Sequence, residues 1–144
     1  MTPPCIQYKA GYKYQLVVPY LIQTQVIPDA PVDLPFIAMD AAGMLMVKAG
    51  YAWDGPSGPT LDTPEFMRGS LVHDALYQLM REGHIDRNTA RPIADALLKQ
   101  LCIEDGMLPF AADLVYEAVR HFAAFAASPQ DEPSVISAPK GCSP

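Results

Sequence analysis

Positive charge is scarce in this chain of 144 residues, which has 10 lysines and arginines against 16 aspartates and glutamates. The resulting formal net charge is -6. A protein that binds nucleic acid through its phosphates needs a basic face, and adsorption to anionic lipid needs clustered lysine and arginine. The composition therefore argues against nucleic acid as a partner and against strong electrostatic binding to an anionic membrane.

Cysteine and long apolar runs are also scarce. The three cysteines, Cys5, Cys102 and Cys142, lie far apart, and no two of them form a CxxC pair. This odd count and wide spacing predict neither a disulfide framework nor a thiolate zinc site. The first residues lack the apolar run of a signal peptide, and no stretch approaches the roughly 20 apolar residues that cross a bilayer. We therefore expect a soluble protein of a reducing compartment.

The first half of the chain has the composition of β-strands. Residues 14–26 are rich in β-branched and aromatic side chains, and Pro19 marks an edge or a break. The following run FIAMDAAGMLMVKAGYAW indicates a hairpin with Gly43 in its turn. We expect the strands within residues 12–53. An irregular loop over residues 54–63 should follow, because it contains two Gly-Pro steps and no periodicity.

The second half of the chain has the apolar spacing of three helices. The first is expected over residues 64–82, with Thr63 as its cap and Gly83 as its end. The second is expected over residues 87–104 and the third over residues 109–127.

Strands followed by helices indicate an α+β fold, with N-terminal β-hairpins or a small antiparallel sheet and then a three-helix part. Residues 1–127 are expected to form this single domain. Residues 128–144 are rich in proline and serine and are predicted to be disordered.

The stretch GSLVHDALYQLM, residues 69–80, places an ionisable pair, His73 and Asp74, inside a helix of mostly apolar residues. A short link makes the first and second helices antiparallel, so residues equidistant from the link face each other. Asp95 is therefore expected to lie level with His73. A carboxylate there would accept a hydrogen bond from one ring nitrogen and leave the other free to act as a base.

Asp74 points about 100° away from His73 around the helix, so it faces a different sector. The loop that begins at Asp54 enters just before this helix and can fold over that sector. Asp54, Asp74 and a carbonyl near Gly55 would then supply the hard oxygen ligands that Ca²⁺ accepts. Tyr77 lies one turn from His73 and can brace the arrangement through its hydroxyl.

Each of these residues also has a plainer interpretation. A single histidine in an amphipathic helix is more often structural, and Asp74 can be a solvated charge at the helix edge. Asp95 can pair with Arg91, which lies one turn earlier on its own helix. The catalytic interpretation depends on the histidine, the carboxylates and the irregular loop occurring together.

Four motifs in a fixed order resemble a phage-encoded domain family of unknown function. They are WDGPSGP in the loop, VHDALYQL in the first helix, RPIADALL in the second and YEAVRHF in the third. The resemblance covers roughly residues 36–125. It implies a phage or prophage origin, phage structural proteins as partners, and a place in the host cytoplasm or the virion.

The same order is similar to that of secreted phospholipases A2, especially the short bacterial and fungal type. This similarity implies that His73 activates water, that Asp95 orients it, and that Asp54 and Asp74 hold calcium with help from the Gly55 carbonyl. Calcium would polarise the ester carbonyl and stabilise the developing oxyanion. The cysteines that staple those enzymes beside the loop aspartate and near the histidine are missing from this chain.

Two functions follow as expectations. The first is a calcium-dependent lipid-ester hydrolase that acts on phospholipid or at a membrane surface, with His73, Asp95 and Tyr77 as its catalytic set. The second is a non-enzymatic phage component, such as a tail or virion accessory protein. In that case the histidine and the carboxylates form a buried polar network that locks the helix pair.

Overall fold

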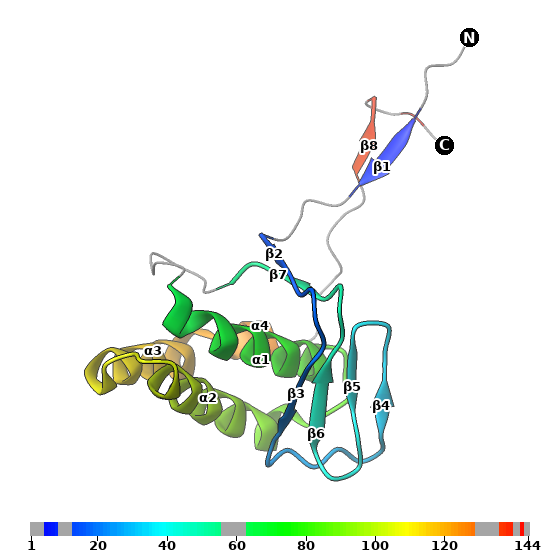
Figure 1. Cartoon of the computed structure of the whole chain (residues 1–144). Helices are drawn as coiled ribbons and strands as arrows, with labels where there is room; N and C mark the ends of the chain where they lie inside the picture. The colour runs from blue at the N-terminus through cyan, green and yellow to red at the C-terminus, as the bar shows by residue number, and fades with distance from the viewer. Residues whose placement is uncertain (1–4, 9–12, 56–62, 129–135, 140–141, 143–144) are drawn as a thin grey trace.

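The computed structural model of the chain describes residues 5–8, 13–55, 63–128, 136–139 and 142, and it confirms the predicted α+β fold (Figure 1). The elements, in chain order, are β1 (Ile6–Tyr8), β2 (Tyr14–Gln15), β3 (Tyr20–Gln23), β4 (Val32–Asp33), β5 (Ile37–Met39), β6 (Met44–Val47), β7 (Ala52–Trp53), α1 (Pro64–Arg81), α2 (Arg87–Glu104), α3 (Pro109–Phe122), α4 (Ala124–Ala127) and β8 (Ile136–Ala138).

The main sheet has four antiparallel strands in the order β3-β6-β5-β4. Strands β5 and β6 are the predicted hairpin, in which Ile37 pairs with Val47 and Met39 pairs with Leu45. These four side chains are all buried, because alternate residues of a strand face the same side of the sheet. They belong to one apolar core with the buried residues of α1. The sheet is thus the platform on which α1 lies.

The predicted strand over residues 14–26 is divided in the structure. Its first part, β2, pairs with β7, and its second part, β3, pairs with β6. Residues 16–19 separate the two parts and include Pro19, which cannot donate to a ladder. This division places β7, and the Asp54 that follows it, outside the main sheet.

Gly43 closes the β5–β6 turn with a φ of 86°, in the left-handed region that favours glycine. A Cβ atom at this position would collide with the carbonyl oxygen of Val26, a backbone atom that cannot swing away. We expect Gly43→Ala to lower the free energy of unfolding by about 2 kcal/mol, measured by urea denaturation. Gly83→Ala is the matched control. Its φ is 78°, but a Cβ there meets nothing within 4 Å. Equal costs for the two variants would contradict the collision.

Helices α1 and α2 form the predicted antiparallel hairpin. Helix α2 begins after Asp86, whose carboxylate accepts a hydrogen bond from the Asn88 N–H, and α1 begins with Pro64 at its first turn. Thr63 is the first cap residue as predicted, although its side chain makes no capping hydrogen bond. The third predicted helix is interrupted, because α3 ends at Phe122 and α4 is a separate turn.

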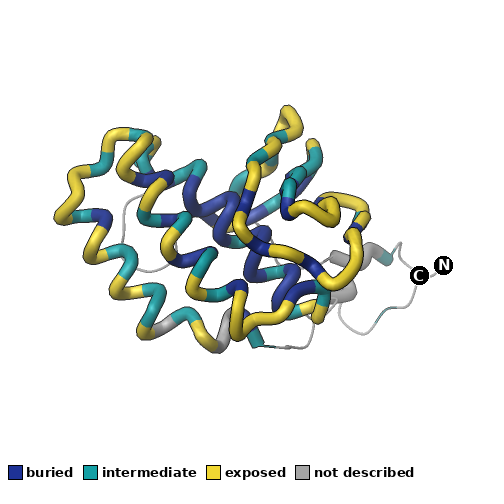
Figure 2. Tube along the Cα trace, turned by 90° about the horizontal axis from the view of Figure 1, so that it is seen from below, coloured by how far each residue is buried: buried dark blue, intermediate teal, exposed yellow. Residues whose placement is uncertain are grey.

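Helix α1 is the most buried of the described helices. It packs against α2 and α4 (Figure 1), and its buried residues share one core with those of the main sheet. Buried positions are dark blue in Figure 2. Eleven of its 18 residues are buried, so polar groups near its centre need partners within the protein. Among the described helices, none combines the length and the apolar character required to cross a membrane.

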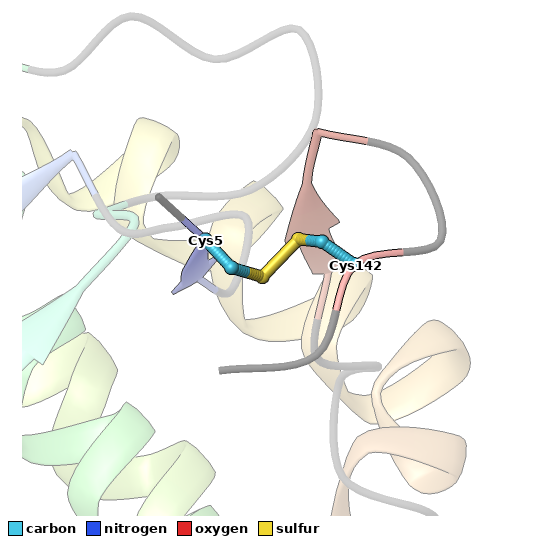
Figure 3. Close-up of a disulfide and its surroundings, with 2 residues drawn as sticks. All are labelled: Cys5 and Cys142. Carbon is cyan, nitrogen blue, oxygen red and sulfur yellow. A yellow bond between two sulfur atoms is a disulfide. The ribbon is translucent and has the colours of Figure 1, made fainter. Parts of the chain in front are cut away.

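The two ends of the chain meet in a separate ribbon (Figure 1), where β1 pairs antiparallel with β8. Cys5 and Cys142 form a disulfide beside it, with their Cα atoms 5.9 Å apart (Figure 3). The prediction of a disordered tail is wrong for residues 136–138, which form a strand. The spacing predicts no disulfide framework, yet two of the three cysteines form one disulfide. The partners are 137 residues apart, so no local pattern reveals the pairing. The disulfide also removes the cysteine argument for a reducing compartment.

Candidate functional site

A buried histidine–aspartate pair joins α1 to α2. His73 Nε2 lies 2.7 Å from Asp95 Oδ1, and the two residues are 8% and 0% exposed. The prediction that Asp95 lies level with His73 is confirmed. Gly69 permits this close approach of the helices, because a Cβ on it would come within 2.9 Å of Leu98 Cδ1.

Asp95 accepts two further hydrogen bonds. The Tyr77 hydroxyl donates to Oδ1 at 2.6 Å, and Arg120 Nη1, from α3, donates to Oδ2 at 2.8 Å. Burial alone would raise the pKa of Asp95, but the hydrogen bonds from His73, Tyr77 and Arg120 outweigh it and hold that pKa below its usual range. Asp95 is therefore ionised at neutral pH.

The ionised carboxylate fixes the tautomer of His73. A carboxylate can only accept, so Nε2 carries the proton of the neutral ring and Nδ1 keeps a lone pair. Among the described residues, no hydrogen bond occupies Nδ1. The ring also lies against the ring of Tyr77, with their centroids 4.1 Å apart. The arrangement can therefore hold an oriented nitrogen base.

Tyr77 braces the pair as predicted, and its hydroxyl stays a donor. Burial raises its pKa well above the usual range, and the hydrogen bond to Asp95 adds to the rise. The alternative pairing of Asp95 with Arg91 is wrong. Arg91 instead donates from Nε to the Tyr77 hydroxyl at 3.2 Å, and from Nη2 to the carbonyl oxygens of Val119 and Arg120 at 3.0 and 2.7 Å.

Arg120 is the site residue that sequence reasoning missed. It belongs to the YEAVRHF motif, but helical spacing within α3 does not reveal which residue of another helix it contacts. The only available signal was a cation within an amphipathic helix.

Asp54 and Asp74 lie on the side of α1 that faces β7. The Trp53 Nε1–H donates to Ser70 Oγ at 3.1 Å, which fixes the end of β7 one turn before Asp74. Asp54 is exposed, and its Oδ1 accepts from the Lys13 backbone N–H at 3.2 Å. Burial raises the pKa of Asp74 to about 7; Arg81 opposes this rise and the charge of Asp54 adds to it. The two carboxylates are therefore electrostatic neighbours.

The carboxylate oxygens of Asp54 and Asp74 suit a hard cation, but they supply only part of its ligands. Asp74 is partly buried, lies near the charge of Asp54 and receives no hydrogen bond from the described part of the chain. A bound cation would therefore lower the free-energy cost of keeping its carboxylate ionised. Calcium takes about six to eight oxygen ligands. No group of three or more His, Cys, Asp or Glu among the described residues is placed to hold a metal. Backbone carbonyls, such as that of Gly55 directly after Asp54, and water would have to complete the shell. Residues 56–62 of the predicted loop lie outside the described residues.

Asp74→Asn is expected to raise the free energy of unfolding by about 2 kcal/mol at pH 8. The full rise of the Asp74 pKa from 3.8 to about 7 corresponds to about 4 kcal/mol, and we halve it because the residue is partly exposed. A raised pKa in the folded state means that ionisation costs stability. The cost is absent below pH 4 and grows until pH 7. Urea denaturation at pH 4 and pH 8 checks this, and a gain that is larger at pH 4 would contradict it.

Comparison with known proteins finds no match: no protein-family model, no curated protein and no solved structure matches the chain. The similarities to the phage-encoded domain family and to phospholipases A2 therefore rest on the motifs alone and stay predictions.

Proposed function

We propose that the protein is a calcium-dependent lipid-ester hydrolase of phospholipase A2 type, with His73 as the base that activates water. One observation carries the proposal: the hydrogen bond of 2.7 Å from His73 Nε2 to a fully buried, ionised Asp95. In the neutral imidazole this bond leaves Nδ1 as the nitrogen that can accept a proton, which is the arrangement that a general base requires.

The reaction would begin with a water molecule hydrogen-bonded to Nδ1. As its oxygen attacks the ester carbonyl, the water gives a proton to Nδ1, and the imidazolium later returns that proton to the leaving alkoxide. Calcium held by Asp54, Asp74 and the Gly55 carbonyl would supply Lewis-acid polarisation of the ester.

Asp95 would serve mainly as the residue that orients His73. Its Oδ2 already lies 2.8 Å from the Arg120 guanidinium, so part of its charge is compensated before the imidazolium forms. The carboxylate would therefore act mainly by orienting the imidazole, because Tyr77 and Arg120 hold both of its oxygens in place.

Fatty-acid release from phosphatidylcholine vesicles tests the proposal. We expect release by the wild type with Ca²⁺, and none when a chelator replaces it. Calcium should also raise the melting temperature of the wild type, and raise it less in Asp74→Asn, because binding to the folded state stabilises it. A wild-type protein that releases no fatty acid with calcium would overturn the proposal.

A second candidate is a non-enzymatic phage virion or tail accessory protein. It is supported by the way the polar network spans three helices: Arg120 reaches from α3 to α2, and Arg91 reaches from α2 to two carbonyls of α3. Such a network would lock the helices and need no substrate. Mass spectrometry of purified particles tests this candidate, which requires the protein in a fixed ratio to the major structural proteins.

A further inference from the structure

A cavity of about 390 Å³ opens where the start of α2 meets the end of α3 and α4. Its walls carry three arginines, Arg87, Arg91 and Arg120, together with Asn88 and Ser128. His73 and Asp74 do not line it, so it opens beside the proposed active site, and Arg91 and Arg120 connect the two through their hydrogen bonds to Tyr77 and Asp95. Its volume lies within the range of roughly 300–1,000 Å³ that is typical of small-molecule pockets.

Among the residues that the structure describes, the charge of this cavity is largely unbalanced. Arg120 has Asp95 as its carboxylate partner. Arg87 donates to Ser128 Oγ at 2.9 Å, and Arg91 donates only to the Tyr77 hydroxyl and to backbone carbonyls, all of them neutral acceptors. Within the described residues, neither Arg87 nor Arg91 forms an ion pair.

The nearest acidic residue in the sequence does not correct this imbalance. Asp86 directs its carboxylate to the Asn88 N–H as the cap of α2, at 3.1 Å. Two guanidinium charges therefore face one cavity in a chain whose net charge is -6. A cleft lined by charges of one sign concentrates ligands of the opposite sign, so this pair of guanidinium groups favours an anionic ligand.

The geometry favours a phosphate group. Guanidinium groups donate charge-assisted N–H bonds to phosphate oxygens, in parallel pairs where a whole edge is free. Arg87 uses only Nη1 within the described residues, whereas Arg91 uses Nε and Nη2 and keeps Nη1 for a ligand.

The Asn88 side chain adds a neutral hydrogen-bonding group, and Pro92 and Ala124 add an apolar wall. The Ser128 hydroxyl donates to the Ala124 carbonyl and accepts from Arg87, so it positions the Arg87 guanidinium. We propose that this cavity binds the phosphate group of a small phosphomonoester, either a soluble molecule or the headgroup of a lipid such as phosphatidic acid. This inference does not depend on the hydrolase proposal.

Isothermal titration of the whole chain at about 150 mM NaCl tests the site with glycerol 3-phosphate as the soluble probe. Vesicles of phosphatidic acid in phosphatidylcholine, compared with phosphatidylcholine alone, test the lipid source. We expect saturable binding with one site per chain to at least one of the two probes. Binding to the soluble ester or only to the charged vesicles identifies the source. Absence of saturable binding to both overturns the proposal.

Two variants locate the binding. Arg87→Gln removes an exposed guanidinium, and Asn88→Asp adds a negative charge at the same wall; both side chains are exposed, so folding should survive. Each should weaken binding about tenfold or more, the scale of a lost charge-assisted hydrogen bond. The control is Lys99→Gln, which removes one positive charge elsewhere on α2, where Lys99 pairs with Asp113. Equal effects of all three variants, or no effect of the two cavity variants, would overturn the assignment.

Discussion

His73→Ala is expected to reduce calcium-dependent fatty-acid release by about 10³-fold, the scale of a lost general base. The variant removes the only ring nitrogen that the structure leaves free to accept a proton from water. Asp95 would still receive hydrogen bonds from Tyr77 and Arg120, so the fold should persist. Initial rates on vesicles at saturating calcium, with circular dichroism as the check on folding, measure the effect.

A conservative variant separates chemistry from structure. His73→Gln offers an amide N–H that reaches the position of Nε2 and can still donate to Asp95, but it provides no base, so it should be as inactive as His73→Ala while being more stable. His84→Ala is the matched control, because His84 lies in the α1–α2 link, near Glu82 and away from the dyad. An active His73→Gln protein would show that the imidazole is not the base and would overturn the role assigned to His73, whereas a wild type without activity would favour the non-enzymatic candidate.

Asp95→Ala is expected to lower the free energy of unfolding by about 3 kcal/mol. The carboxylate is fully buried, and its removal strands the Tyr77 hydroxyl, the His73 N–H and one edge of the Arg120 guanidinium. The cost stays at the lower end for a broken buried ion pair, because the Arg120 side chain is 29% exposed and water can reach its charge. Urea denaturation at pH 7 measures the loss, and Asp95→Asn, which keeps the shape and one acceptor, should cost less.

The same carboxylate predicts a pH dependence of stability. Because the pKa of Asp95 is lowered in the folded protein, its contribution is fully present above the unfolded pKa of about 4. It is lost as the pH falls from there through the folded pKa. The difference between wild type and Asp95→Ala should therefore be constant between pH 5 and 7 and should shrink below pH 4. A difference that stays constant down to pH 2 would contradict the lowered pKa.

The stability loss in Asp95→Ala does not by itself decide the function. A catalytic dyad exposed to solvent would tolerate removal of the carboxylate, whereas a buried network would not. The structure places Asp95 at 0% exposure, so both candidate functions now predict a large cost. Activity of the wild type and of the His73 variants is the measurement that separates them.

What the sequence determined by itself is the part of the protein governed by local periodicity and short connections. Helix α2 has the bounds that its apolar spacing predicts, and the turn glycine of the β5–β6 hairpin was evident because only glycine adopts its backbone conformation without strain. The pairing of His73 with Asp95 was likewise predictable from the sequence. A short link makes two helices antiparallel, and the facing residues then follow from counting along the chain.

Only the tertiary structure decided the contacts between elements that no short link joins. Arg120 of α3, and not Arg91 of α2, completes the shell of Asp95, because the approach of α3 depends on packing over the whole helix face. The disulfide between Cys5 and Cys142 depends on two strands meeting across 137 residues. The arginine cavity likewise needs α2, α3 and α4 together. Periodicity fixes which face of an element is buried, but the three-dimensional packing selects its partner.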